Sequence, residues 1–402
     1  MNPRRTETAR PGSDVVILGA GPAGLVLANL LHQSGIDCVV LERASREHVE
    51  TRARAGYLAP ETVRILERHG LADGLRARGR EHDVCEFRTP EGRFRLRYGG
   101  LGRGEPHTVY PQQSLVSDLI AEFTAAGGRI AFETEARSVT GVDGDRPTVL
   151  THDLDGRPTQ WPASYVAGCD GRHGAARRAI PAADARRRHS DHGVSWLAVL
   201  VAAPASMDAV GYAVHREGFA GHMSRGPETT RYYLQCDRGT ATDSWSEDRI
   251  WSALAHRLRA DEYGPLREGP VLERGIVHLE SDVLRPLRHG SLFLVGDAAS
   301  LVSPSAAKGA NLAVLEAEIL AQALAAAVLR GDPRPLLRYS DRCLSHIWRA
   351  QEFSHWMIRL LHAPTAPQES SGFHDSLRYA RLESLRTSRS HQDWFAENYV
   401  GL

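Results

Sequence analysis

A glycine-rich turn near the N-terminus has the spacing of a phosphate-binding motif. The chain reads Gly19-x-Gly21-x-x-Gly24, and Glu42 follows 18 residues after the last of these glycines. Glycines allow a tight turn whose backbone N–H groups can approach a pyrophosphate at a helix N-terminus. An acidic residue about twenty positions further on can accept hydrogen bonds from ribose hydroxyls. The set predicts dinucleotide binding, whereas the glycines alone would also fit a turn without function.

Two aspartates that follow apolar segments are further candidates. Asp170 follows segment 165–167 within Cys-Asp-Gly, and Asp297 follows segment 292–295 within Gly-Asp-Ala. An aspartate at a strand end can hydrogen-bond the hydroxyls of a polyol, but it is also a common turn or N-cap residue. Each aspartate taken singly favours the turn or cap. The order of all three motifs favours a cofactor site.

The glycine turn requires a strand before it and a helix after it. Segments 15–18 and 38–41 are short and apolar, and 25–33 has helical periodicity that ends before Gly35. A strand, a helix and a second strand within about thirty residues form a βαβ unit with parallel strands. The sequence predicts an α/β fold with a Rossmann-like domain.

Later segments predict that this domain is discontinuous. Segment 114–125 reads as a helix, and 130–132 and 148–150 read as hairpin strands. Segment 196–235 is rich in strand formers, and a helix is expected over 312–329. The predicted division is a flexible tail (1–13), a first part of the dinucleotide-binding domain (14–190), an inserted β-sheet substrate domain (191–275), a second part (276–331) and C-terminal helices (332–402).

Composition excludes several classes of function. The chain has 402 residues, 42% of them hydrophobic and 24% charged, which is ordinary for a globular protein of two or three domains. The 49 basic and 49 acidic residues cancel, so no net positive charge attracts nucleic acid or an anionic membrane. The most apolar predicted helix carries Glu316 and Glu318, which would be costly in lipid. We expect a soluble protein that acts on a small molecule.

The cysteines and histidines predict neither disulfides nor a metal site. Five cysteines lie far apart without a C-x-x-C pair, which fits a reducing cytoplasm. His189 and His192 have a spacing that can bind a metal, but they follow three consecutive arginines at 186–188. We predict no metal there.

The motifs together resemble those of the single-component (group A) flavoprotein aromatic hydroxylases, most closely the 4-hydroxybenzoate 3-monooxygenase family. The resemblance covers nearly the whole chain. It implies FAD as cofactor, NADPH or NADH as reductant, a small aromatic acid and molecular oxygen as substrates, and a cytoplasmic homodimer. The matching stretches are Leu41–Arg43, Arg52–Gly56, Thr108–Tyr110, Ala167–Gly171, Gly218–Ala220, Arg231–Tyr233, Ala307–Gly309 and Glu397–Leu402.

The resemblance also implies cofactor contacts. Glu42 would bind the adenosine ribose, Asp297 the ribityl chain, and Asn311 would lie near the isoalloxazine. For Arg52 and Arg54 the alternative is a solvated basic face. The full predicted FAD set is Gly19, Gly21, Gly24, Glu42, Arg43, Arg52, Arg54, Gln112, Asp170, Asp297 and Asn311. The predicted NAD(P)H set is Arg43, Arg54 and His173.

The implied reaction reduces FAD with a nicotinamide, captures oxygen as a flavin hydroperoxide and transfers one oxygen atom to a phenol. The protein must bind the carboxylate, deprotonate the phenol and exclude water. Matching positions are Arg225 and Tyr233 for the carboxylate, Tyr212 for the phenol, Tyr399 and His82 for a proton path to solvent, Pro304 for a carbonyl facing the phenol, and Lys308 for positive potential.

Several positions depart from the family pattern. Met223 replaces a serine that binds the substrate carboxylate, Val210 and Gly221 replace leucines that line the ring, and Tyr57 replaces a valine near the flavin. The nicotinamide side also differs, at His48 and Glu280, so the sequence does not choose between NADH and NADPH.

The smaller side chains predict space for a ring substituent. We therefore expect a substrate such as 3-amino-4-hydroxybenzoate. The alternatives are an ordinary 4-hydroxybenzoate 3-hydroxylase, and a flavoprotein that binds an aromatic acid without oxygenating it.

Overall fold

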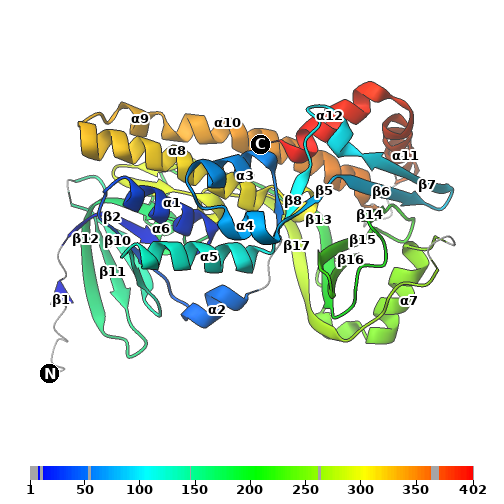
Figure 1. The fold of residues 1–402 in the computed structure, drawn as a ribbon, viewed down its shortest axis with the longest axis horizontal. Coiled ribbons are helices and arrows are strands. Elements are labelled where there is room, and N and C mark those ends of the chain that lie inside the picture. The colour runs from blue at the N-terminus through cyan, green and yellow to red at the C-terminus, as the bar shows by residue number, and fades with distance from the viewer. Residues whose placement is uncertain are drawn as a thin grey trace.

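The computed structural model describes residues 8–9, 12–52, 56–144, 146–260, 264–363 and 371–401. Its strands form a nine-stranded sheet, an eight-stranded sheet and a small three-stranded sheet. The two large sheets lie at opposite ends of the molecule, and helix α10 (Tyr339–Leu361) runs along the top of the view from one toward the other (Figure 1).

The first sheet has a parallel centre. Strand β2 pairs in parallel with β3 and β12, and β12 pairs in parallel with β19. This confirms the predicted α/β fold. The strands of this sheet are β1 (Thr8–Ala9), β2 (Ser13–Leu18), β3 (Cys38–Leu41), β9 (Arg129–Ala131), β10 (Glu135–Thr140), β11 (Thr148–His152), β12 (Pro158–Gly168), β18 (Arg288–His289) and β19 (Leu292–Leu294).

Two sequence predictions about this sheet need correction. Strand β9 is not half of a hairpin, because it pairs in parallel with β3 at the sheet edge; only β11 lies in an antiparallel hairpin, between β10 and β12. The predicted tail contributes β1, which pairs with β12. Both differences arise from long-range strand pairing, which local residue patterns do not specify.

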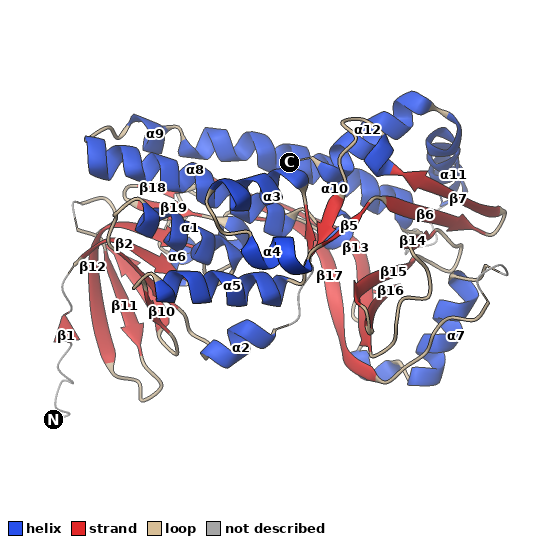
Figure 2. Cartoon of the chain, viewed as in Figure 1, coloured by secondary structure: helices blue, strands red, loops and turns tan. Residues whose placement is uncertain are grey.

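Helices pack against the first sheet (Figure 2). Helix α1 begins at Pro22, three residues before the predicted start, because proline is favoured in the first turn of a helix. The helices are α1 (Pro22–Gln33), α2 (Arg46–Thr51), α3 (Pro60–Arg68), α4 (Asp73–Arg78), α5 (Gln112–Ala125), α6 (Ala175–Arg178), α7 (Glu247–Arg257), α8 (Gly309–Arg330), α9 (Arg334–Leu337), α10, α11 (Ser371–Thr387) and α12 (Arg389–Val400).

Helix α8 is long and apolar enough to cross a membrane, but 72% of its most apolar window is buried inside the protein. It packs against α1. It ends at Gly331, whose φ of +65° is the left-handed conformation that glycine adopts at helix C-termini. The helix is part of the core.

The second sheet crosses the predicted domain boundaries. Residues 190 and 275 fall inside its two longest strands, β13 and β17, which pair with each other. Strands β6 and β7, from the stretch assigned to the first domain, join this sheet through β14. The strand order is β20 (Ser300–Leu301), β17 (Val271–Arg285), β13 (Arg186–Val201), β16 (Thr229–Asp237), β15 (Ala220–Gly226), β14 (Val210–Ala213), β6 (Val84–Thr89) and β7 (Gly92–Arg97).

The two faces of the second sheet bury different clusters. Leu197, Val199 and Leu234 pack with Leu254 of α7. The opposite face, which carries Trp196 and Tyr212, packs with residues of α10, α11 and α12. This second face is the one that holds the predicted substrate residues.

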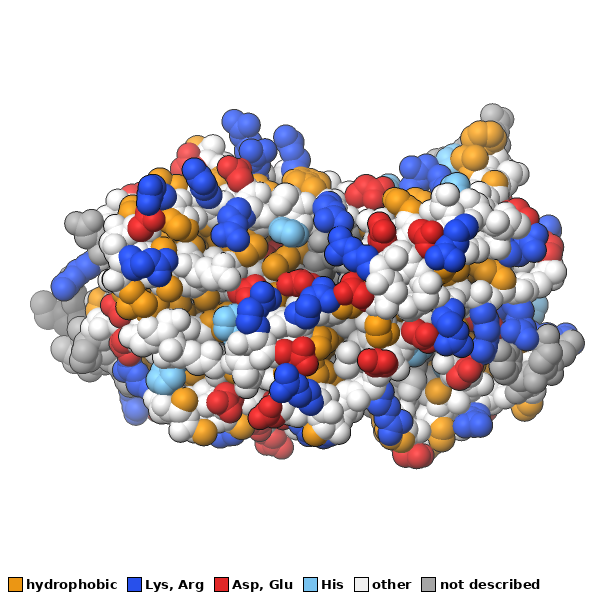
Figure 3. Space-filling view, turned by 45° about the horizontal axis from the view of Figure 1, so that its top comes forward, with side chains coloured by type: hydrophobic (Ala, Val, Ile, Leu, Met, Phe, Trp, Pro, Cys, Tyr) orange, Lys and Arg blue, Asp and Glu red, His pale blue; other side chains and the backbone are white. Residues whose placement is uncertain are grey.

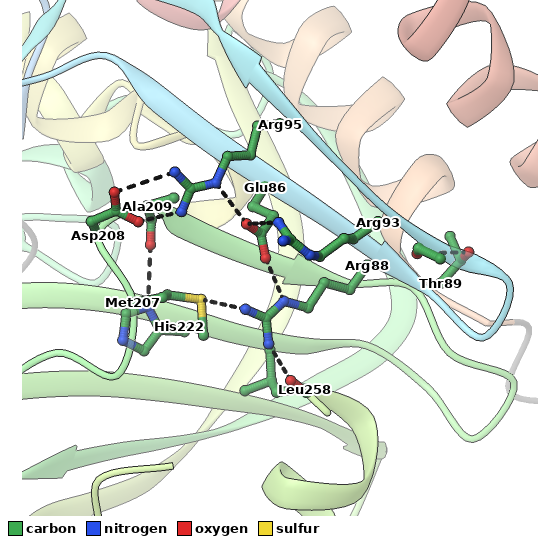
Figure 4. Close-up of polar contacts among 11 residues, drawn as sticks. Glu86, Arg88, Thr89, Arg93, Arg95, Met207, Asp208, Ala209, His222 and Leu258 are labelled. Carbon is green, nitrogen blue, oxygen red and sulfur yellow. Dashed lines mark hydrogen bonds and ion pairs between the residues drawn. The ribbon is translucent and has the colours of Figure 1, made fainter. Parts of the chain in front are cut away.

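A buried ion cluster attaches the β6–β7 hairpin to this sheet (Figure 4). Glu86 is fully buried, and its carboxylate accepts from Arg88 Nε at 2.6 Å, Arg95 Nε at 2.9 Å and Arg93 Nη1 at 3.2 Å. Arg88 also contacts the Leu258 carbonyl, just past α7. One carboxylate therefore joins three arginines within the hairpin, and Arg88 and Arg95 in turn contact Leu258 and Asp208 outside it.

The third sheet holds residues of the predicted site in the region between the two large sheets. It consists of β4 (Tyr57–Leu58), β8 (His107–Val109) and β5 (Arg80–His82). It carries Tyr57 and His82 of the predicted site. On the face shown in Figure 3, basic and acidic side chains are interspersed, as the zero net charge leads one to expect.

Candidate active site

The glycine turn has the geometry that its spacing predicts. Gly19 has a φ of +97°, and a Cβ there would lie 2.6 Å from the Cys169 carbonyl oxygen. A Cβ at Gly24 would lie 2.0 Å from the Gly19 oxygen. Gly21, the N-cap of α1, faces open space and makes no side-chain cap. The N–H groups at the start of α1 thus face a space that an anion can enter.

Five predicted cofactor residues line a cavity of about 140 Å³ beside this turn. They are Gly21, Glu42, Arg43, Arg52 and Gln112. Both oxygens of the Glu42 carboxylate are positioned by the backbone, since they accept from Ala20 N and Ala44 N at 2.8 Å each. Arg54 lies outside the described residues.

The two predicted aspartates differ in their surroundings. Asp170 Oδ2 accepts from Ala176 N at 3.1 Å at the start of α6, and Oδ1 is buried without a hydrogen-bond partner among the described residues. Burial raises the pKa of this carboxyl group. Asp297, by contrast, is exposed although its neighbours Gly296 and Ala298 are buried. Asp170 thus contacts the first turn of α6, whereas Asp297 lies at the surface.

Two cofactor candidates remain, Asn311 and His173. Asn311 is buried and tied to the backbone: its Nδ2 donates to Tyr57 O at 2.9 Å and to Ala307 O at 2.7 Å, and its Oδ1 accepts from Ala59 N at 2.7 Å. It therefore fixes β4 against the start of α8. His173 is exposed and lies just before α6.

The predicted substrate residues of the second sheet share one face. Directly opposed residues of antiparallel strands point the same way. Gly221 opposes Tyr212 on one side and Tyr233 on the other, and Met223 follows at the next position of that face. Val210 shares it by alternation. Arg225 lies where the β15–β16 register shifts, a bulge of the kind that redirects a side chain.

The space predicted beside Gly221 is filled. A Cβ at Gly221 would lie 2.8 Å from Phe219 Cζ and 3.2 Å from Tyr233 Cδ2. The aromatic rings leave no room even for a methyl group at this position. The prediction that Gly221 frees volume for a ring substituent is therefore wrong, because neighbouring rings occupy that volume.

Two predicted tyrosines form a buried pair. The hydroxyl oxygens of Tyr212 and Tyr399 are 2.7 Å apart. Burial raises the pKa of both phenols, so both are protonated at neutral pH. Each hydroxyl can then accept one proton while it donates its own. The pair has the geometry of a proton relay.

Beside Tyr399 lie two residues that sequence reasoning missed, Tyr98 and His107, and the Tyr98 hydroxyl donates to the His82 carbonyl oxygen. His82 Nδ1 lies 3.1 Å from the Tyr98 hydroxyl, and His107 Nδ1 lies 3.1 Å from the same oxygen. The rings of Tyr98 and His107 each lie 5.0 Å from the Tyr399 ring. Burial lowers the pKa of both histidines, which are thus neutral at pH 7. Only the position of His107 beside the matching stretch Thr108–Tyr110 hinted at this.

Lys308 and Pro304 lie next to the same pair. Lys308 is fully buried, and its Nζ donates to the Tyr399 carbonyl oxygen at 3.0 Å and to that of Gly401. Burial lowers its pKa to about 7. Pro304 begins a short 3₁₀ turn (Pro304–Ala306), and its carbonyl accepts from Ala307 N at 3.3 Å. Lys308 therefore anchors the backbone that carries Tyr399.

The parallel sheet carries a cleft of the nucleotide-binding type, and the second sheet holds a buried tyrosine pair. Together they define an enzyme that binds a nucleotide cofactor and is built on two sheets. The family model described as "FAD binding domain" matches residues 12–354, and the chain belongs to this family. It is a flavoprotein aromatic hydroxylase, a monooxygenase that uses FAD and NAD(P)H.

Individual relatives agree with this assignment. The chain is 35% identical over 388 residues to p-hydroxybenzoate hydroxylase of Acinetobacter baylyi, covering 96% of this chain and 95% of the relative. It is 28% identical over 372 residues to a 3-amino-4-hydroxybenzoate 2-monooxygenase of Streptomyces platensis, covering 88% and 90%. The solved structure of p-nitrophenol 4-monooxygenase from Pseudomonas putida has a TM-score of 0.82 at 20% identity, covering 98% and 99%, and shows the same fold.

The residues present fit FAD. The uncapped start of α1, the basic cavity with Glu42 and the outward-facing Asp297 suit a pyrophosphate, a ribose and a polyol respectively. When bound, FAD supplies the redox and oxygen-transfer chemistry. Gly19, Gly21, Gly24, Glu42, Arg43, Arg52, Gln112 and Asp297 would hold it.

Replacing Asp297 with alanine is expected to weaken FAD binding. Loss of a charged acceptor for hydroxyl groups costs about 1.5 to 3 kcal/mol, roughly 10- to 150-fold in affinity. Titration of apoprotein with FAD, followed by flavin fluorescence, measures this change. Asp332→Ala, beyond the far end of α8, is the control and should bind normally. Unchanged affinity in Asp297→Ala would contradict the assignment.

Proposed function

We propose that the enzyme hydroxylates a 4-hydroxybenzoate-type acid. The observation that carries this proposal is the buried Tyr212–Tyr399 pair on the sheet face that also presents Tyr233 and the bulge residue Arg225. A phenol needs a proton acceptor, and a carboxylate needs a cation and hydroxyl donors. One face of one sheet offers both.

The chain's own residues would prepare the substrate. Arg225 would pair with the carboxylate, which orients the ring, and the hydroxyl of Tyr212 would accept the phenolic proton while passing its own to Tyr399. Because burial keeps both tyrosines neutral, neither needs to carry a charge. Neutral His82, half-buried in β5, would receive the proton on its way to solvent.

Three observations bear on the ring substituents. The rings of Phe219 and Tyr233 close the space beside Gly221, which favours 4-hydroxybenzoate itself. The name of the Streptomyces relative supports 3-amino-4-hydroxybenzoate, the substrate expected from sequence, as the second candidate. The higher identity to the Acinetobacter enzyme adds weight to the first.

The test compares both acids on the FAD-loaded enzyme. We expect 4-hydroxybenzoate to bind at least about tenfold more tightly than the 3-amino acid, a difference of about 1.4 kcal/mol, since the added group meets a filled wall. Flavin fluorescence gives both dissociation constants, and mass spectrometry of the product identifies the added oxygen. Tighter binding and better-coupled oxygenation of the 3-amino acid would reverse the choice.

A homodimer in the cytoplasm stays a prediction. Trp356 and Trp394 pack against each other with ring centroids 5.0 Å apart, whereas Trp348 of α10 is 46% exposed. Trp348, and Trp394 of α12, which is 36% exposed, are therefore the candidate contacts on the C-terminal helices. Light scattering of the purified protein checks the subunit number.

A further inference from the structure

Tyr57 is held firmly beside the substrate face. Its strand, β4, pairs with β8, and its carbonyl oxygen accepts from Asn311 Nδ2 at 2.9 Å. Its ring contacts the edges of His82 and His107, with centroids 5.5 and 5.9 Å away. It belongs to the cluster that includes Tyr212, Met223 and Tyr233. The backbone hydrogen bond from Asn311 and the two histidine contacts thus fix the position of the phenol ring.

The hydroxyl of Tyr57 is the unusual part of this residue. It is buried, and it has no hydrogen-bond partner among the described residues. The whole side chain is 3% exposed. A buried hydroxyl without a partner is unfavourable, so such a group marks a place that a ligand completes. Burial raises its pKa, which keeps the hydroxyl protonated and able to donate.

The surroundings of this hydroxyl indicate an anionic ligand. The charge of Arg225 and the phenol of Tyr233 are the groups that act electrostatically on it. Met223 lies on β15, the strand that also carries Arg225, and its side chain is a thioether, which cannot donate a hydrogen bond. A ligand that reaches Arg225 and Tyr233 therefore lacks a donor from position 223.

We propose that the Tyr57 hydroxyl donates a hydrogen bond to the carboxylate of the aromatic acid, together with Arg225 and Tyr233, and supplies the donor that Met223 does not. This inference rests on the proposed function, since it needs an aromatic acid in the pocket. Tyr57 is then a specificity residue that recognises the acid group from β4, outside the second sheet.

The experiment uses the FAD-loaded enzyme and its Tyr57→Phe variant, which keeps the ring. Flavin fluorescence measures the dissociation constants of 4-hydroxybenzoate and of 4-methylphenol, which has a methyl group in place of the carboxylate. We expect Tyr57→Phe to weaken the acid by at least about tenfold and to change 4-methylphenol by less than about twofold. Tyr165→Phe, in strand β12 of the first sheet, is the matched control and should change neither.

A second variant moves the donor to the other strand. Adding Met223→Ser to Tyr57→Phe places a hydroxyl on β15, and we expect it to recover part of the lost affinity for the acid. The affinity for FAD, titrated separately, should be the same in all variants.

Three results would overturn the inference: equal binding of the acid to Tyr57→Phe and the unchanged enzyme, equal weakening of both ligands, or a loss confined to FAD affinity. The first result would show that the hydrogen bond does not form. The second would show that the hydroxyl acts only in packing, and the third that it contacts the flavin instead of the acid. If the unchanged enzyme does not bind 4-hydroxybenzoate, the proposed function itself fails.

Discussion

The Tyr212→Phe enzyme is expected to bind 4-hydroxybenzoate and consume NAD(P)H but to release mainly hydrogen peroxide. The variant keeps the ring and loses the hydroxyl that lies 2.7 Å from Tyr399 Oη. Without it the phenolic proton has no acceptor at this position, and the ring stays less electron-rich at the attacked carbon. General-base assistance is worth about 10² to 10⁴ in rate, so the hydroxylation rate should fall by that factor.

Two measurements separate this effect from a packing defect. The ratio of hydroxylated product to NAD(P)H consumed should collapse in Tyr212→Phe, while the dissociation constant for the acid changes little. Tyr399→Phe should show the same uncoupling, because it breaks the same pair from the other side. Full coupling in either variant would exclude the tyrosine relay.

The parts of the fold that local sequence determines were predictable. Strand β3 spans Cys38–Leu41 as expected, and the glycine turn lies between β2 and α1. Short apolar runs, proline and glycine act on their own neighbourhood, so their consequences can be read without the rest of the chain. Glu42 lines the cavity for the same reason, since it directly follows β3.

Features that depend on distant partners were not predictable. Nothing in residues 84–97 indicates that β6 will pair with β14, more than a hundred residues later. The filling of the space beside Gly221 depends on the rotamer of the Phe219 ring. Tyr98 and His107 meet only because η1 (Tyr98–Gly100) and β8 fold onto the same side of the site. These contacts come from tertiary packing, which residue types alone leave open.

The buried ion cluster at Glu86 leads to the second large effect, on stability. Glu86→Gln is expected to lower the free energy of unfolding of the second sheet by about 3 to 5 kcal/mol, the usual cost of removing one partner from a buried ion pair. Arg88, with a side chain only 4% exposed, would keep its charge without the carboxylate that balances it. The contacts that Arg88 and Arg95 make with Leu258 and Asp208 outside the hairpin would then be less firmly positioned (Figure 4).

Glu61→Gln is the matched control, because Glu61 also pairs with arginines, in its case Arg64 and Arg68. Its side chain, however, is 38% exposed. Exposed pairs contribute about 0 to 1 kcal/mol, so this variant should unfold almost normally. Urea unfolding followed by tryptophan fluorescence measures the stability, because Trp196 of the second sheet, Trp251 of α7 and Trp161 of the first sheet are all buried. Burial rather than the number of arginines should decide the outcome. If both variants lose the same stability, the cluster acts as a surface network and does not anchor the hairpin.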